Sequence, residues 1–193
     1  AKAAARFNEQ TIAGSFSILD FSLSRKTDVY QGTANLSAEN FTMGLASGQK
    51  FSGTARAGGM QIQGTLNQFS INTAVEITDG IFSSPNLTVK TAGISSPLSI
   101  RKNASQLVIS FSPELKKTSL QPAQANPVQA EQLLGQGMIF TQDEDVWSFQ
   151  GKVGARALSY SLGQDQIFSA PDPHAQFEFI CDAKKSGKPD YRG

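Results

Sequence analysis

Apolar and polar residues alternate with a period of two along most of this chain, and this pattern constrains the fold more than any other feature. In the clearest case, Phe69, Ile71, Val75 and Ile77 fall at odd positions, and mostly polar or small residues fall between them. Successive side chains of a β-strand point to opposite faces, so this spacing places the apolar side chains on one face. The segment is therefore predicted to be a strand with one buried face.

Two turn signals follow this strand. Asp79-Gly80 is a preferred pair for a two-residue β-hairpin turn, because both central positions of that turn need positive φ. We therefore expect the chain to reverse there, with a returning strand that begins at Ile81. The residues of Ser84-Pro85-Asn86 are typical of a second turn.

The alternation changes phase inside two other strand candidates. Phe16 and Ile18 share one phase, whereas Phe21 and Leu23 take the opposite one. The same slip occurs between residues 38 and 41. One extra residue in a strand produces such a slip, so each site is predicted to be a β-bulge or a strand that is buried on both faces.

The whole pattern predicts an all-β chain, namely an antiparallel β-sandwich or barrel of roughly ten strands. Helix signals are few, and at most one short helix is expected, near residues 127–134. Asn126 can cap that helix, Pro127 suits its first position and Gly135 suits its end.

The chain is predicted to hold one β domain over residues 11–181. Residues 1–10 precede it as an N-terminal arm, and residues 182–193 follow it as a C-terminal tail that is rich in Lys and Arg. Residues 113–137 contain several Pro and Gln and are interpreted as a linker-like insertion. A single domain is preferred because the strands after this insertion are too few to bury a core alone.

Composition excludes several classes of function. Seventeen Lys and Arg against sixteen Asp and Glu leave a net charge of +1, which disfavours a dedicated nucleic-acid binder. One His and one Cys exclude a disulfide framework, a four-cysteine zinc site and a two-histidine metal site within one chain. Because no apolar run approaches ~18 residues, no transmembrane helix is predicted.

Residues with catalytic or metal-binding chemistry are sparse. Asp172, His174 and Glu178 are weak candidates for a metal or acid–base site, since His174 and Glu178 share a face if this segment is a strand. The preferred interpretation is structural: Pro171 and Pro173 give an extended lead-in to an edge strand, and His174 hydrogen-bonds there. Nucleophile, phosphate-loop and dinucleotide motifs are absent, so no catalytic residue and no cofactor is expected.

Three functions stay open on these observations. The first is a non-enzymatic structural subunit of a repetitive assembly, such as a virion or a tail tube. The second is a periplasmic or envelope β-protein that binds an apolar, lipid-like ligand in a groove. The third is a hydrolase or lyase on a β-sandwich. Gly-Thr pairs recur at residues 32–33, 53–54 and 64–65. These strands resemble β-rich bacterial envelope proteins that shield lipids, and also the β-barrel subunits of phage tails and other virions.

Self-association is the expected mode of interaction, with other assembly proteins as possible partners. Charged residues make up only 17% of the chain, so few Lys and Glu are present to keep exposed strand edges from pairing. Strand edges and the two terminal segments are the expected contacts. A virion or other assembly is the favoured location, and the periplasm or cell envelope is the alternative.

Overall fold

The computed structural model describes residues 2–7, 10–44, 48–144, 146–161, 167–182 and 190–192. These residues form thirteen β-strands, and none of them is helical. The strands are β1 (Lys2–Phe7), β2 (Gln10–Lys26), β3 (Val29–Gly44), β4 (Lys50–Gly64), β5 (Phe69–Ser83), β6 (Leu87–Lys102), β7 (Gln106–Phe111), β8 (Glu114–Pro122), β9 (Val128–Asp143), β10 (Val146–Ser161), β11 (Ile167–Ala170), β12 (His174–Asp182) and β13 (Asp190–Arg192). The predicted all-β antiparallel class is confirmed.

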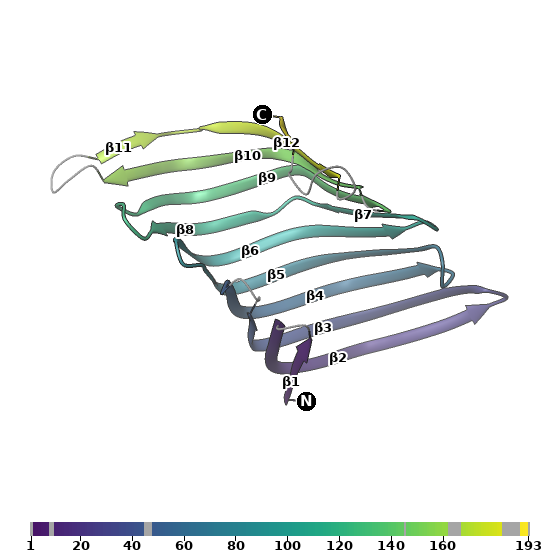
Figure 1. Cartoon of the computed structure of the whole chain (residues 1–193). Helices are drawn as coiled ribbons and strands as arrows, with labels where there is room; N and C mark the ends of the chain where they lie inside the picture. The colour runs from purple at the N-terminus through teal and green to yellow at the C-terminus, as the bar shows by residue number, and fades with distance from the viewer. Residues whose placement is uncertain are drawn as a thin grey trace.

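The strands form one continuous sheet, in which consecutive strands mostly lie side by side (Figure 1). β7 and β8 share one place in this order, because each pairs with β6 and with β9 over a different part of their length. The path of pairing runs from β1 to β13 and every pair is antiparallel. The sequence predicted a sandwich or a barrel, and alternation cannot show how such a sheet is arranged, because it identifies only the two faces of each strand.

The predicted hairpin at Asp79-Gly80 is wrong. Both residues lie inside β5, which pairs with β6 on both sides of them. Asp79 does have a positive φ of 53°, but this left-handed residue forms a bulge in a continuous strand. The turn predicted at Ser84-Pro85-Asn86 is confirmed, and the Ser84 N–H donates to the Leu87 carbonyl oxygen at 2.8 Å.

Both predicted phase slips are β-bulges. The pairing of β2 with β3 shifts between Leu19 and Ser22, where Asp20 has a φ of 51°. The pairing of β3 with β4 shifts between Ala38 and Phe41, where residue 40 has a φ of 49°. The slip of apolar residues along the sequence therefore reports the extra residue of each bulge.

The expected short helix near residues 127–134 is not formed. Val128 begins β9, and the linker-like stretch 113–137 contains all of β8 and the first part of β9. A two-turn helix is marginal by itself, whereas this segment gains partners on both edges, from β8 and from β10. Strand pairing of this segment therefore stabilises it more than a short helix with capping residues would.

The terminal segments are partly strands. The expected N-terminal arm contains β1, which pairs with residues 10–15 of β2. In the expected C-terminal tail, Asp182 is the last residue of β12. The strand β13 pairs with β12 over three residues. The remaining tail residues, 183–189 and 193, lie outside the described residues.

The sheet leaves far more surface in contact with solvent than a compact chain would. Its solvent-accessible surface is 12,975 Å². A compact monomer of 20.6 kDa is expected to expose roughly 8,900 Å². The excess agrees with a single layer of strands (Figure 1).

Candidate apolar binding face

One side of the sheet carries most of the large apolar side chains. Directly paired residues of antiparallel strands project from the same face, so the strand register gives the composition of each face. One row across the sheet is Ile77, Ile94, Leu115 and Leu133, each paired with the next. We call the side that carries this row the apolar face.

Further rows on the apolar face repeat this composition. One contains Met43, Phe51, Phe82, Val89, Leu120, Val128 and Tyr160, and another contains Ile62, Ile71, Ile100, Ile109, Phe140 and Phe149. Aromatic rings lie against one another here, with the ring centroids of Phe41 and Phe51 5.4 Å apart. The apolar face therefore continues across the sheet from β3 to β10.

The opposite side is polar, and we call it the polar face. Its cross-strand neighbours are hydroxyl groups, such as Ser17 and Ser37, whose oxygens lie 2.6 Å apart. Gln132 Nε2 donates to Glu114 Oε1 at 2.6 Å on the same face. Such side chains satisfy their hydrogen bonds among themselves and with water, so this face suits solvent.

A line of residues with left-handed backbone crosses the sheet at one level, and two of them, Asn40 and Asp79, lie in β-bulges. The residues with left-handed backbone in this line are Asn40 in β3, Asp79 in β5, Lys117 in β8 and Ala157 in β10, with φ between 48° and 53°. A bulge bends its strand and increases the local twist. Because these left-handed residues lie at one level on alternate strands, they bend the sheet at the same place.

Four buried residues lie along this line of left-handed residues, and we call them the crease. The crease consists of Gly80, Thr91, Thr118 and Ala130, which occupy consecutive strands on the apolar face. Thr118 is 2% exposed and Ala130 is 4% exposed. The described residues form a single sheet, so this burial comes from larger side chains of the same face.

The side chains of Ile77 and Ile94 lie close to Gly80, at the bottom of the crease. A Cβ added to Gly80 would lie 3.6 Å from the Ile94 Cδ1 atom and 3.7 Å from the Ile77 Cγ2 atom. The same Cβ would lie 3.0 Å from the Thr91 Cγ2 atom, which is tighter than ordinary contact. The apolar face is therefore concave along the crease, and small residues are required at its bottom.

Two threonine hydroxyl groups hold the bottom of the crease together. Thr91 Oγ1 lies 2.9 Å from the carbonyl oxygens of both Gly93 and Lys116, and it can donate to either. Thr118 Oγ1 donates to Thr91 Oγ1 at 3.3 Å. These bonds give backbone carbonyl groups a side-chain donor next to the left-handed residue Lys117.

Beside the crease, the apolar face contains a hollow of about 370 Å³. We call it the alanine hollow, because Ala38, Ala55 and Ala57 form its floor. The larger side chains around that floor are Phe16, Ile18, Leu36 and Val75. This volume and lining fall in the range of small-molecule sites, which are about 300–1,000 Å³ and mostly apolar.

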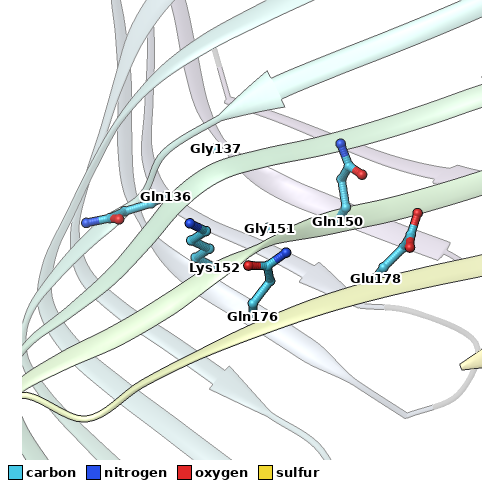
Figure 2. Close-up of a pocket in the computed structure, with 7 residues that line it drawn as sticks. All are labelled: Gln136, Gly137, Gln150, Gly151, Lys152, Gln176 and Glu178. Carbon is cyan, nitrogen blue, oxygen red and sulfur yellow. The ribbon is translucent and has the colours of Figure 1, made fainter. Parts of the chain in front are cut away.

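A second hollow, of about 420 Å³, lies on the polar face. Figure 2 shows its side chains on β9, β10 and β12, and they are Gln136, Gln150, Lys152, Gln176 and Glu178. Register pairs Gln136 with Lys152 and Gln150 with Glu178, so all of them belong to the polar face. These amide, ammonium and carboxylate groups suit water.

The structure separates Glu178 from His174 in the set that the sequence singled out as a possible metal or acid–base site, together with Asp172. His174 begins β12 and Glu178 lies four residues further along the same strand, which is a distance of about 13 Å. His174 Nδ1 lies 3.4 Å from the backbone carbonyl oxygen of Asp172. Within the described part of the chain, no group of three His, Cys, Asp or Glu side chains is arranged to hold a metal ion.

Sequence reasoning did not identify the alanine hollow. Its floor comes from β3 and β4, and its walls from β2 to β5. The only signal in the sequence is small residues at apolar-phase positions. That signal becomes informative only once the bulge-shifted register is known.

Comparisons with protein-family models, with curated proteins and with solved structures gave no match. A search of the described residues found no helix long and apolar enough to cross a membrane.

Proposed function

We propose that this protein binds an apolar, chain-like molecule of the lipid class on its apolar face. This is the second function expected from the sequence, a β-protein of the periplasm or cell envelope with a groove for a lipid-like ligand. The observation that carries the proposal is the apolar face itself, which is continuous, concave at the crease and uncovered by any second layer of the described residues.

The shape of the apolar face favours flexible chains over a second sheet. Two packed sheets need side chains that interdigitate across about 10 Å over a broad, smoothly twisted surface. The crease and the alanine hollow interrupt that surface, whereas acyl chains can follow a bent trough. Burial of each methylene group there is worth about 0.8 kcal/mol, so a long acyl chain gains ample binding energy from contact with carbon alone.

The proposal assigns no catalytic step to the protein. Contact with Phe16, Ile18, Leu36 and Val75 holds the ligand and carries no reactive group. We keep the expectation from the sequence that the chain is not an enzyme as part of this proposal.

A binding titration tests the proposal. The probe is a long-chain fatty acid that carries an environment-sensitive fluorophore. Ala57→Phe fills the alanine hollow and is expected to weaken binding about tenfold, which corresponds to ~1.4 kcal/mol. Ala74→Phe is the matched control, because Ala74 is exposed on the polar face of the next strand.

The two variants give opposite expectations. Ala74→Phe should bind the fatty acid as the unmodified chain does. If the unmodified chain does not bind the probe, or if both variants weaken binding equally, the proposed function is wrong.

A second candidate is the structural subunit of a repetitive assembly, which the sequence favoured first. A specific observation supports it: from Ser17 to Lys26, the outer edge of β2 pairs with no strand among the described residues. An unpaired edge is a template for another strand. A measurement of particle mass at high micromolar concentration tests this candidate, because a repetitive assembly requires particles much larger than a dimer.

A further inference from the structure

We infer that the ligand of the apolar face is an anionic amphiphile, whose headgroup pairs with the Lys102 ammonium group and whose chain runs from there toward the alanine hollow. The inference rests on the proposed function and adds the charge and the direction of the ligand. It begins from a row of cross-strand neighbours at one end of the sheet, where β5 begins and β6 ends. We call it the end row, and it contains Arg25, Tyr30, Phe69, Lys102, Leu107 and Trp147.

The end row belongs to the apolar face. Phe69 lies two residues before Ile71 in β5, and the pairing of β5 with β6 is regular from Phe69 to Thr78. Residues two apart in a regular strand project from the same face. Phe69 and its partner Lys102 therefore share the face of Ile71 and Ile77.

Charge is distributed unevenly over the apolar face. Among the cross-strand pairs of the described residues, Arg25 and Lys102 are the charged residues on this face, and both lie in the end row. Carboxylates in such pairs, for example those of Glu76, Glu114 and Glu178, project from the polar face. The apolar face therefore attracts anions at one end.

The two cations differ in whether they can take a new partner. Arg25 Nη2 already lies 2.9 Å from Asp28 Oδ1, and the Arg25 guanidinium group lies 5.4 Å from the centroid of the Tyr30 ring. None of the carboxylates that the structure describes lies within ion-pair distance of Lys102, which is half-buried beside Phe69. Lys102 is therefore the cation that a ligand can neutralise.

A ligand that covers the end row must satisfy the Lys102 ammonium group. Removal of a charge from water without a partner costs far more free energy than contact with one methylene group returns. An anionic headgroup offsets that cost, because it pairs with the ammonium group as the row is covered. Cationic and uncharged headgroups leave the ammonium group without a counter-charge, so they are disfavoured.

The position of Lys102 sets the direction of the chain. Lys102 pairs with Phe69, and Val75 of the alanine hollow lies six residues further along β5. Ile71 and its partner Ile100 lie on this path. Six residues of a strand span about 20 Å, which is similar to the length of an extended long-chain fatty acid. A carboxylate at Lys102 therefore places the methyl end of the chain in the alanine hollow.

Displacement of the fluorescent fatty acid by two amphiphiles tests the charge preference. The competitors are hexadecanoate and hexadecyltrimethylammonium, used below their critical micelle concentrations, because their chains are similar and their headgroups have opposite charges. Hexadecanoate should displace the probe from the unmodified chain at a concentration at least tenfold lower. Lys102→Met keeps an unbranched side chain and removes the charge, so it should abolish this preference. The ratio of the two concentrations is compared, so that a change in affinity for the probe itself cancels.

Arg101→Met is the matched control, because Arg101 is the preceding residue of β6, is exposed and belongs to the polar face. It removes the same charge from the chain and should keep the preference for hexadecanoate. The inference is overturned if both amphiphiles displace the probe equally well from the unmodified chain, or if Lys102→Met keeps the preference. The proposed function still stands in those cases, since the apolar face binds both chains. If the probe does not bind the unmodified chain at all, the proposed function is itself wrong.

Discussion

At the scale of single residues, the crease depends on the Thr91 hydroxyl group. It is the hydrogen-bond partner of two backbone carbonyl oxygens, on Gly93 and Lys116, and it accepts from Thr118. Thr91→Val keeps the shape of the side chain and removes these bonds. We expect this variant to lower the free energy of unfolding by about 1–2 kcal/mol, because a buried carbonyl group loses its donor. Denaturation in urea measures the change.

The matched control for this prediction is Thr78→Val. Thr78 is exposed on the polar face of β5, so the same substitution there should change the free energy of unfolding by less than about 0.5 kcal/mol. Equal losses for the two variants would contradict the role of Thr91 in the crease.

At the scale of the strand, the bulges bend the sheet, and β10 offers a test in which two substitutions have opposite signs. Ala157 has a φ of 51°, which is unfavourable for a residue with a Cβ, whereas Ala155 lies in regular pairing with Leu133. Ala157→Gly should therefore raise the free energy of unfolding by about 0.5–1 kcal/mol, and Ala155→Gly should lower it by a similar amount. Thermal or urea denaturation that shows both variants destabilised to the same extent would contradict the left-handed conformation of Ala157.

The bulges also show which irregularities of the strands can be predicted from the sequence and which cannot. Phase slips near residues 20 and 40 identified two bulges correctly, because an extra residue shifts every apolar side chain after it. The Asp79-Gly80 pair was assigned to a hairpin, because a left-handed residue is compatible both with a turn and with a bulge. Only the pairing of β5 with β6 beyond Asp79 distinguishes these outcomes, and that pairing is a long-range contact.

At the scale of the whole molecule, the fold class was predictable and the candidate site was not. Alternation gives each strand its apolar face, so an all-β chain follows from the sequence. The alanine hollow depends on Ala38 lying opposite Ala55 across a bulge, and local residue types do not encode that register. The arrangement of the strands in a single layer could not be predicted either, because alternating residues do not show what covers the apolar face.

The solvent-accessible surface of the sheet is unusually large for a chain of this length. An accessible surface of 12,975 Å² means that the sheet leaves apolar side chains without a second layer to cover them. Monomeric soluble proteins rarely expose apolar patches larger than a few hundred Å², and larger patches mark sites of interaction. We propose that a lipid-class ligand on the apolar face supplies that cover.

Photocrosslinking with a long-chain fatty acid that bears a diazirine near its methyl end tests the central claim most directly. The account predicts that mass spectrometry finds adducts on residues that line the alanine hollow, such as Ile18, Ala57 and Val75. The neighbours of Val75 on the polar face, Ala74 and Glu76, should carry few adducts, because they project from the other side of the sheet. Adducts spread evenly over both faces would contradict the account.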